Sequence, residues 1–459
     1  MNTKFHIFSS ATTAATIFGR SREFIFGPVV ASMMENGVNL PVADRPMFNV
    51  PISDKKHSAS FSKEEQQSQE FVETNHSIYL KYLTGKWLDD IITVYMNHFF
   101  ATLDETLDLD NFGEDCRSLE LHDLMRRLVF NTSRVTFFGS RLPTFWKNMW
   151  PDFRAFSDAT YAGVRSNMAY YLQPRAYLGR ERMLKAFDRW VDCEVEDWKE
   201  EEGVWNEKWG IRMNWERENL ARKYGFTHRG RACSQAGFLF VIIANAAPMA
   251  TWFIVSIIQS PERLERFRRE VYPLLIPQSG LNPNDLRFDM AKLKANPYVH
   301  GLWNEALRLG SASAAARVVS KDTELEGYAL KRGSVVLLPV QLLHFDEDVF
   351  PNPEQFIPER WISELPSSAT NEEREAAMQQ QRKQAASLRS FGGGTGLCSG
   401  RFVAEQEILS TVSTMLLLFD IELEDGPKDF KLSPRSIGIM SPAKETKVKL
   451  RKRKNPRSL

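Results

Sequence analysis

One long stretch of this chain contains no charged residue. Residues 236–258 are almost entirely apolar, with Asn245 and Pro248 at the centre. A stretch of this length could cross a membrane, or it could form a helix that is buried on all sides in a large core. Pro248 removes a helical hydrogen bond and is expected to kink or widen the helix. The pattern of side chains leaves both alternatives open.

The remaining hydrophobic pattern predicts a mainly helical protein with a small β region. Apolar residues at helical spacing predict helices over 78–103, 298–309 and 402–419, and several more between 118 and 200. Short apolar runs bounded by turn residues predict strands at 317–319, 324–328 and 335–338. Residues 1–8 predict a strand that leads into a helix start at 9–12.

Polar segments separate these elements. Residues 41–78 are rich in Pro, Ser and Lys and predict a loop, whereas the highly charged residues 194–224 predict an exposed helix and loop. Residues 362–389, rich in Glu, Gln, Arg and Ser, predict an exposed insertion, and residues 447–459 predict a basic tail in solvent. No linker, repeat or low-complexity run divides the chain, so we expect a single domain over residues 1–459.

Composition narrows the class of protein. The net charge of +1 argues against a general nucleic-acid binder, and 43% hydrophobic residues suffice for a large core. The four cysteines are widely spaced without a C-x-x-C pair, which argues against a disulfide framework or a zinc site. The N-terminus lacks the basic start and apolar run of a signal peptide.

The strongest chemical signal is the segment from Phe391 to Phe402, FGGGTGLCSGRF. Its glycines permit positive φ and close approach to a bulky group, and they present Cys398 at the start of an apolar helix. The partial positive charge of a helix N-terminus favours thiolate over thiol. A thiolate beside Phe391 could bind the iron of a flat, apolar cofactor, and haem fits this description.

Two alternatives compete for this segment. A lone cysteine is usually an inert buried side chain. A glycine-rich loop before a helix can also bind phosphate, but the segment has neither a Gly-Lys-Ser/Thr ending nor G-x-G-x-x-G spacing.

Three motifs in order resemble the cytochrome P450 (haem-thiolate) family. Phe-Gly-x-Gly-x-x-x-Cys-x-Gly around Cys398 is similar to the family's cysteine loop, and Glu305-Ala306-Leu307-Arg308 is similar to its Glu-x-x-Arg element. Between them, Pro358-Glu359-Arg360-Trp361 resembles its Pro-Glu-Arg-Phe/Trp element. The combination is specific, although Glu-x-x-Arg alone would mean little, and the resemblance is strongest after residue 230.

The resemblance implies one haem b and a role for each matching residue. Cys398 would be the axial iron ligand, and Phe391, Gly394, Gly400 and Arg317 would bind the cofactor, with Arg317 facing a haem propionate. Glu305, Arg308 and Arg360 would form a buried ion triad that stiffens the scaffold behind the cysteine loop.

The chain also departs from the family pattern. Most members carry an acid and a threonine in the middle of the long apolar helix, where this chain has Ala244 and Asn245. Asn245 is assigned a catalytic role in proton management, with helix packing as the alternative. Gly396 replaces a His or Arg that contacts a propionate in many relatives, and Ile91 replaces an arginine four residues after Trp87, leaving Lys81 or Lys86 as substitutes.

We therefore expect a monooxygenase that uses O2 and electrons from an NADPH-dependent flavoprotein reductase. The substrate would be a sterol, terpenoid or other apolar secondary metabolite, because Asn with a nearby Pro is similar to the branch of sterol and bile-acid hydroxylases and prostacyclin synthase. That branch keeps an alternative open, a haem-thiolate isomerase or dehydratase that acts on a peroxide without O2 or reductase. A non-enzymatic haem carrier is a further alternative.

Localisation follows only from the resemblance. The family implies the endoplasmic reticulum membrane, but the anchor helix and first elements of eukaryotic members are not found in this chain, so a cytoplasmic location is the alternative. Peripheral contact with a membrane through the basic C-terminal residues is a weaker expectation.

Overall fold

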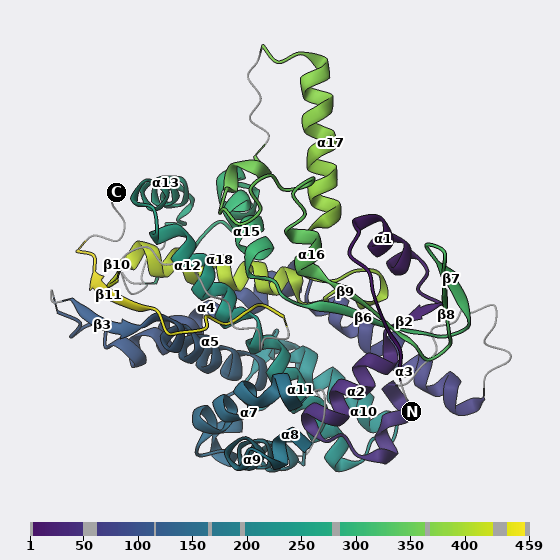
Figure 1. The fold of residues 1–459 in the computed structure, drawn as a ribbon. Coiled ribbons are helices and arrows are strands. Elements are labelled where there is room, and N and C mark those ends of the chain that lie inside the picture. The colour runs from purple at the N-terminus through teal and green to yellow at the C-terminus, as the bar shows by residue number, and fades with distance from the viewer. Residues whose placement is uncertain are drawn as a thin grey trace.

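Helices dominate the computed structural model, which describes residues 3–48, 62–113, 116–163, 168–192, 198–277, 285–362, 368–425 and 438–454 (Figure 1). The α-helices among these residues are α1 (Ala11–Gly19), α2 (Gly27–Val38), α3 (Lys63–Tyr82), α4 (Gly85–Leu107), α5 (Leu121–Phe138), α6 (Leu142–Phe145), α7 (Met149–Gly163), α8 (Met168–Tyr171), α9 (Pro174–Val191), α10 (Arg212–Lys223), α11 (His228–Ala244), α12 (Ala246–Ile258), α13 (Pro261–Val271), α14 (Met290–Ala295), α15 (Pro297–Gly310), α16 (Val340–His344), α17 (Asn371–Ser387) and α18 (Arg401–Leu418).

Short strands and 3-10 turns complete the described chain. The strands are β1 (Phe5–Ile7), β2 (Phe24–Ile25), β3 (Arg117–Glu120), β4 (Trp205–Asn206), β5 (Gly210–Ile211), β6 (Ala314–Val319), β7 (Thr323–Leu325), β8 (Tyr328–Leu330), β9 (Val335–Pro339), β10 (Phe419–Leu423) and β11 (Lys447–Lys452). The 3-10 turns are η1 (Val42–Phe48), η3 (Glu200–Glu202), η4 (Tyr272–Leu274), η5 (Pro358–Trp361) and η6 (Gly394–Gly396).

The long apolar stretch lies at the centre of the fold. Among the described residues, the one stretch long and apolar enough to cross a membrane is His228–Ile258, and 72% of its most apolar window is buried within the protein. Helix α12 packs against α5, α15 and α18, and α11 packs against α9 and α5. In the structure this stretch is a core helix, because neighbouring helices cover its apolar surface on several sides.

The predicted distortion of this stretch is confirmed. The helix is divided at Asn245 into α11 and α12, where the backbone has φ −102° and ψ −29°. Pro248 has no N–H to donate to the carbonyl of Ala244, which explains the break three residues before the proline.

A four-stranded sheet joins the N-terminus to the segment after α15. The strand order is β1-β9-β6-β2, with β1 parallel to β9 and the other pairs antiparallel. Ser10 caps α1 by accepting a hydrogen bond from the N–H of Thr13, so the predicted strand and helix start are both present. The sheet fixes the position of Arg317 on β6.

Two predictions for the N-terminal third are wrong. The supposed loop at 41–78 contains η1 and most of α3, while residues 49–61 lie outside the described part of the chain. Helix α3 begins at a capping box between Ser62 and Glu65, and it buries Phe71 and Ile78. The single helix expected at 78–103 is instead two, α3 and α4, which meet at Leu83 and Thr84.

Two charged segments differ from expectation, whereas the exposed segment predicted at 362–389 is confirmed for its described residues. Residues 447–452 of the supposed basic tail form β11, which pairs with β10 and β3 and buries Val448 and Leu450. Within 194–224, α10 is not an exposed helix, because it buries Arg217 and Glu218, and Glu218 binds Arg222 and Arg231 at 2.9 Å. The polar segment at 362–389 contains α17, which projects away from the body of the protein (Figure 1). Most of α17 is exposed, and only Gln384 and Ser387 at its base are buried.

Candidate active site

A cavity of about 510 Å³ lies where the cysteine loop, β6 and the junction of α11 and α12 meet. Cys398, Arg317, Asn245, Phe391 and Gly400 all line it, although they come from separate parts of the sequence. Most other lining side chains are apolar, including residues of α2, α5 and α15. We call this space the Cys398 cavity.

Backbone hydrogen bonds hold the cysteine loop in shape. The N–H of Cys398 donates to the carbonyl of Phe391 at 3.0 Å, which closes the loop on itself. Gly392 and Gly394 have φ of +76° and +59°, a region that strongly favours glycine. Arg401, the first residue of α18, donates to the Cys398 carbonyl at 2.9 Å. The loop therefore presents the sulfur in a fixed position next to a helix start.

The electrostatics of Cys398 differ from the expectation based on the helix N-terminus. The side chain is accessible from the cavity that it lines, although protein atoms surround most of it. Burial by surrounding atoms raises the pKa of the Cys398 thiol, and the backbone N–H groups of Gly400 and Arg401, with the Arg401 charge, only partly oppose this effect. A bound metal ion would reverse the balance, since a coordinating thiol is deprotonated outright.

Arg317 is a buried cation at the cavity wall. It is 2% exposed, and its guanidinium donates to the carbonyls of Gly393 at 2.7 Å and Ala316 at 2.8 Å. No acidic side chain among the described residues pairs with it, and burial lowers the pKa of Arg317 to about 10. A buried charge without a counter-charge is costly, so this position favours an anionic ligand group in the cavity.

Gly396 makes room for this arginine. A Cβ atom at position 396 would lie 2.6 Å from Nη2 of Arg317 and 3.2 Å from the ring of Phe26. The substitution of glycine for the usual His or Arg is therefore matched by the placement of Arg317 in the same space. Gly394, by contrast, does not line the cavity, and its backbone lies against Phe18 of α1.

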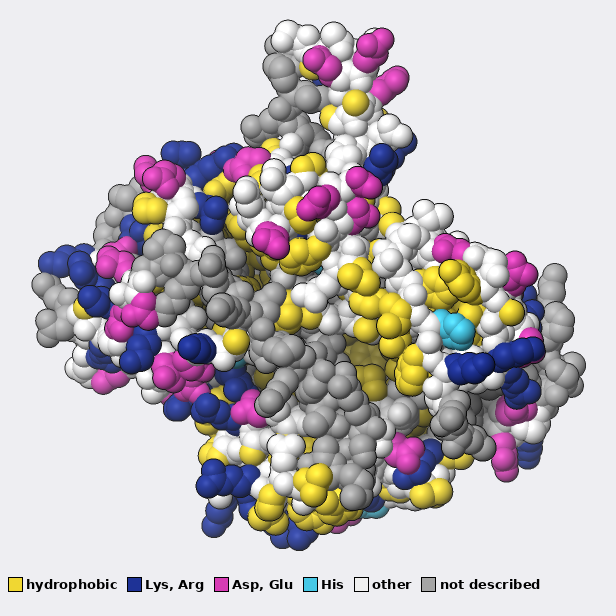
Figure 2. Space-filling view, in the orientation of Figure 1, with side chains coloured by type: hydrophobic (Ala, Val, Ile, Leu, Met, Phe, Trp, Pro, Cys, Tyr) yellow, Lys and Arg dark blue, Asp and Glu magenta, His cyan; other side chains and the backbone are white. Residues whose placement is uncertain are grey.

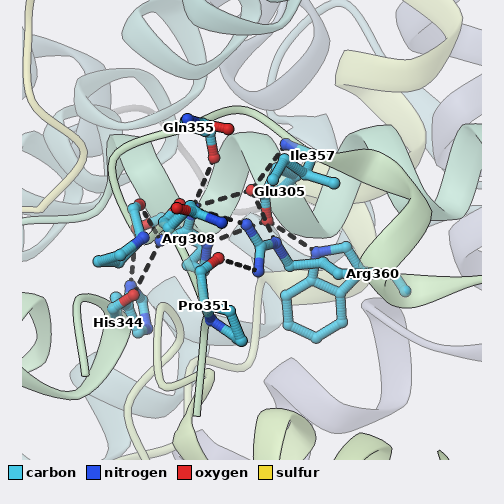
Figure 3. Close-up of polar contacts among 10 residues, drawn as sticks. Glu305, Arg308, His344, Pro351, Gln355, Ile357 and Arg360 are labelled. Atoms are coloured by element: carbon cyan, nitrogen blue, oxygen red, sulfur yellow. Dashed lines mark hydrogen bonds and ion pairs between the residues drawn. The ribbon is translucent and has the colours of Figure 1, made fainter. Parts of the chain in front are cut away.

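Behind the loop, Glu305 is the centre of a fully paired ion triad (Figure 3). Arg308 donates to both of its carboxylate oxygens, at 2.8 and 2.9 Å, and Arg360 donates at 3.1 Å. The N–H of Ile357 and the indole N–H of Trp361 donate to the same carboxylate at 3.0 and 2.9 Å. The structure thus brings the three predicted residues together.

His344 connects this triad to the cysteine loop. Its Nε2 accepts from the N–H of Arg389 at 3.0 Å, so Nδ1 carries the proton and donates to the carbonyl of Arg308 at 2.9 Å. Burial lowers the pKa of His344 to about 4, which keeps the ring neutral near pH 7. The triad and the loop are therefore linked through one neutral imidazole.

Asn245 faces the Cys398 cavity from the helix break. Its side chain is exposed, although it lies in the middle of the most buried helical stretch. Oδ1 accepts from the N–H of Ile439 at 2.9 Å. A Cβ atom at Gly438 would lie 2.1 Å from this oxygen, so the close contact requires glycine there. Asn245 thus joins the helix to the C-terminal turn, of which residues 426–437 lie outside the described chain.

The suggested lysine substitutes do not reach the cavity. Lys81 binds Glu216 at 2.7 Å, and neither Lys81 nor Lys86 is part of the cavity lining. Tyr79 and Leu83 of the same region do line it. Helix α3 supplies cavity-lining residues, whereas no residue of α4 lines the cavity.

Among the lining residues that the sequence did not single out is one acid. Glu407 lies on α18 and is 4% exposed, and burial raises the pKa of its carboxyl to about 8. The carboxyl is therefore mostly protonated at pH 7. Glu407 next to the apolar residues 408–409 of α18 was the available signal.

The residues around the cavity fit a haem. They offer one thiol for the iron, an apolar surface for a flat ring, and in Arg317 a buried guanidinium without an acidic partner among the described residues. That unmatched charge is the feature a propionate would complement.

Comparison with known proteins finds similarity to one family. The family model for cytochrome P450 matches residues 233–450. Cytochrome P450 monooxygenase calL of Penicillium decumbens is 28% identical over 367 residues, which cover 76% of this chain and 64% of that protein. Cholesterol 7-alpha-monooxygenase of Cricetulus griseus is 27% identical over 236 residues, 49% of this chain and 45% of that protein. The chain thus matches less than two thirds of the length of these relatives.

Solved structures share the fold. The haem domain of cytochrome P450DA covers 99% of this chain with a TM-score of 0.65 and 16% sequence identity, and the match covers 89% of that domain. Retinoic acid bound cyanobacterial CYP120A1 covers 98% of this chain with a TM-score of 0.66 and 16% identity, and the match covers 89% of that chain.

Proposed function

We propose that this chain, which matches the cytochrome P450 family model over residues 233–450, is a haem-thiolate monooxygenase that oxidises an apolar, lipid-like substrate. The observation that carries the proposal is the convergence of Cys398, Arg317 and Asn245 on one apolar cavity. Members of the family hold a haem iron through a cysteine thiolate. In this chain Cys398 takes that role, since it is the one cysteine that lines the cavity among the described residues.

The remaining site residues have one of two roles: they bind the cofactor, or they hold the cysteine loop in position. Arg317 would pair with a propionate, Phe391 and Gly400 would contact the cofactor, and Gly394 shapes the loop. Glu305, Arg308 and Arg360 fix the segment behind the loop through His344 and Arg389. None of the triad lines the cavity, so its role is structural support.

The reaction consumes one substrate C–H bond, O2, NADPH and a proton, and it yields the alcohol, water and NADP⁺. When bound, the thiolate-ligated haem supplies oxygen activation, which electron donation from sulfur favours. The chain contributes an apolar cavity that excludes water and orients substrate. Asn245 presents its amide to this cavity in place of the usual acid and threonine, and its role is to direct proton transfer.

Sterols, terpenoids and related secondary metabolites are the proposed substrates. The apolar lining supports this class, and so does the similarity to a cholesterol 7-alpha-monooxygenase. Electrons would come from an NADPH-dependent flavoprotein reductase.

Contact with a membrane is part of the same proposal. On the face seen in Figure 2, hydrophobic side chains gather around the four-stranded sheet. Phe5 and Ile7 of β1 are 62% and 64% exposed, and Tyr328 of β8 is 64% exposed. An apolar patch of this kind suits contact with the endoplasmic reticulum surface, from which an apolar substrate would enter.

The direct test is turnover of a sterol and terpenoid panel by the haem-loaded protein, with and without reductase and NADPH. We expect product only in the complete system, with one atom from labelled O2 in each product molecule. Turnover of an organic endoperoxide without reductase would instead support the isomerase alternative, which the absence of the acid and threonine at Ala244 and Asn245 favours.

Asn245→Ala should uncouple NADPH consumption from product formation. We expect product per NADPH to fall on the order of tenfold, with a matching rise in hydrogen peroxide, because the cavity loses its positioned amide. Asn245→Asp, which retains the oxygen that accepts from Ile439, controls for loss of the C-terminal turn. Wild-type product yield and wild-type peroxide release in Asn245→Ala would assign the residue to packing.

Arg317→Ala should weaken haem retention. Loss of one charge-assisted hydrogen bond corresponds to about 10- to 100-fold faster haem loss to an excess of scavenging apoprotein. Arg317→Lys should lose haem at a rate between those of the wild type and Arg317→Ala, since lysine keeps the charge but lacks the planar guanidinium. Arg127→Gln on the surface of α5 is the matched control and should not change the rate. Equal rates for all variants would remove Arg317 from the cofactor site.

A further inference from the structure

A second cavity, of about 290 Å³, lies on the other side of the helix break. It is enclosed by α5, α7, the junction of α11 and α12, and the C-terminal turn, and we call it the His122 chamber. Cys398 does not line it. The lining residues it shares with the Cys398 cavity are Met33, Val241, Asn245, Gly438 and Ile439.

The two cavities are therefore separated by a thin wall. One part of the wall is the hydrogen bond between Asn245 and Ile439, and the other is formed by Met33 and Val241. Val241 is 56% exposed, although it lies within the central helix, so its exposed surface faces the cavities it lines. Met33 is only half-buried, and its unbranched thioether is the most easily displaced part of the wall.

His122 provides a free hydrogen-bond acceptor in the chamber. Its Nδ1 lies 3.0 Å from the Thr251 hydroxyl, and that hydroxyl donates to the carbonyl of Ala247 at 2.9 Å. Thr251 must therefore accept from Nδ1–H, which leaves the lone pair of Nε2 unused. No donor among the described residues bonds to Nε2, and His122 lines the chamber although it is only 4% exposed.

The protonation state of His122 is fixed by its surroundings. Burial lowers the pKa of the ring to about 3, and the charges of Arg126 and Arg154 act in the same direction. The imidazole is thus neutral across the physiological range, and Nε2 can accept but not donate. No titration of His122 is expected between pH 5 and pH 8.

Among the described lining residues of the chamber, the charged ones are Arg126 and Asp158, which bind each other at 2.6 Å. The guanidinium of Arg126 also lies 5.6 Å from the ring centre of Trp150. The rest of the lining combines apolar side chains such as Phe153 and Phe240 with the hydroxyls of Ser157, Thr160 and Ser441. The carbonyl of Ala244 also borders the chamber without an α-helical donor, because Pro248 has no N–H. The unused hydrogen-bonding groups of the chamber are therefore acceptors, which suit a neutral ligand that donates a hydrogen bond.

From this arrangement we propose that the His122 chamber binds the hydroxyl-bearing end of an elongated, neutral apolar ligand, whose other end reaches the Cys398 cavity past Met33. His122 Nε2 accepts the hydrogen bond from the hydroxyl. Identification of that ligand as the substrate rests on the proposed function, whereas the binding site itself does not. The inference narrows the substrate class to molecules that already carry a hydroxyl group remote from the position to be oxidised.

A matched pair of probes tests the chamber in the haem-loaded protein without reductase. By titration calorimetry, 4-phenylphenol should bind about three- to tenfold more tightly than biphenyl, as expected for one neutral hydrogen bond. His122→Phe should bring this ratio close to one while biphenyl affinity is kept, and His122→Gln, which retains an acceptor, should preserve it. His98→Phe is the control, since His98 is also a partly buried neutral imidazole on a nearby helix and does not line the chamber.

A separate measurement tests whether a ligand in the His122 chamber also reaches the Cys398 cavity. Imidazole binding to the haem iron shifts the Soret band, and 4-phenylphenol should raise its apparent Kd in the wild-type protein but much less in His122→Phe. An unchanged imidazole Kd would overturn the connection between the cavities. Equal affinities of the two probes, or a preference that survives His122→Phe, would overturn the hydroxyl site. Both readouts are independent of turnover, so their failure is distinguishable from failure of the proposed function.

Discussion

Cys398→Ser should eliminate the thiolate signature of the bound haem. In the reduced protein with carbon monoxide, we expect the strongly red-shifted Soret band of the wild type to disappear completely. A serine oxygen is a poor substitute for soft sulfur as an iron ligand, and Cys398 is the only cysteine in the cavity lining of the described chain. Monooxygenase turnover should fall to background in the same variant.

Cys116→Ser is the matched control for this experiment. Cys116 is exposed and does not line the Cys398 cavity, so its replacement should leave the band unchanged. A red-shifted band that persists in Cys398→Ser would show that another residue holds the iron. A wild-type spectrum typical of histidine-ligated haem would contradict the assignment of the ligand from the start.

The second large effect is expected at Glu305. Glu305→Gln leaves Arg308 and Arg360, whose side chains are 0% and 7% exposed, without their counter-charge. Removal of one partner from a buried ion pair costs about 3–5 kcal/mol. We expect the free energy of unfolding, measured by denaturant titration and circular dichroism, to decrease by this amount. The cysteine loop should also lose order, because His344 connects the triad to Arg389.

Arg127→Gln provides the comparison for stability as well. It breaks the surface pair between Arg127 and Asp123 at 2.7 Å, in which the arginine is 50% exposed, and a pair of this kind contributes below about 1 kcal/mol. A similar small loss in Glu305→Gln would mean that the triad is dispensable for folding. A normal fold with an altered haem spectrum would move its role from stability to the cofactor site.

Local sequence determined the parts of this protein whose chemistry is carried by neighbouring residues. The glycines around Cys398 imply a loop with positive φ, and Gly392 and Gly394 adopt it. Pro248 implies a helix break, which occurs at Asn245. The spacing of Glu305 and Arg308 places them on one helix face, and Ser10 marks the start of α1. In each case the decisive interactions lie within a few residues.

Other predictions failed where burial overrode polarity. Helix α3 was taken for a loop because its sequence is polar, yet a capping box and a few buried side chains suffice to form it. Helix α10 was taken for an exposed segment, but Glu218 is buried and paired with two arginines. A polar residue that is paired in the fold looks the same in the sequence as one that faces water.

Only the tertiary structure decided the chemistry of the site. It placed Arg317 in the space left by Gly396, set Asn245 against Gly438, and left His122 Nε2 without a donor among the described residues. It also reversed the expected shift of the Cys398 thiol, because burial outweighs the helix N-terminus. These outcomes depend on distances between residues that are up to 193 positions apart, as for Asn245 and Gly438 (438 − 245), and such distances are set by packing rather than by local sequence.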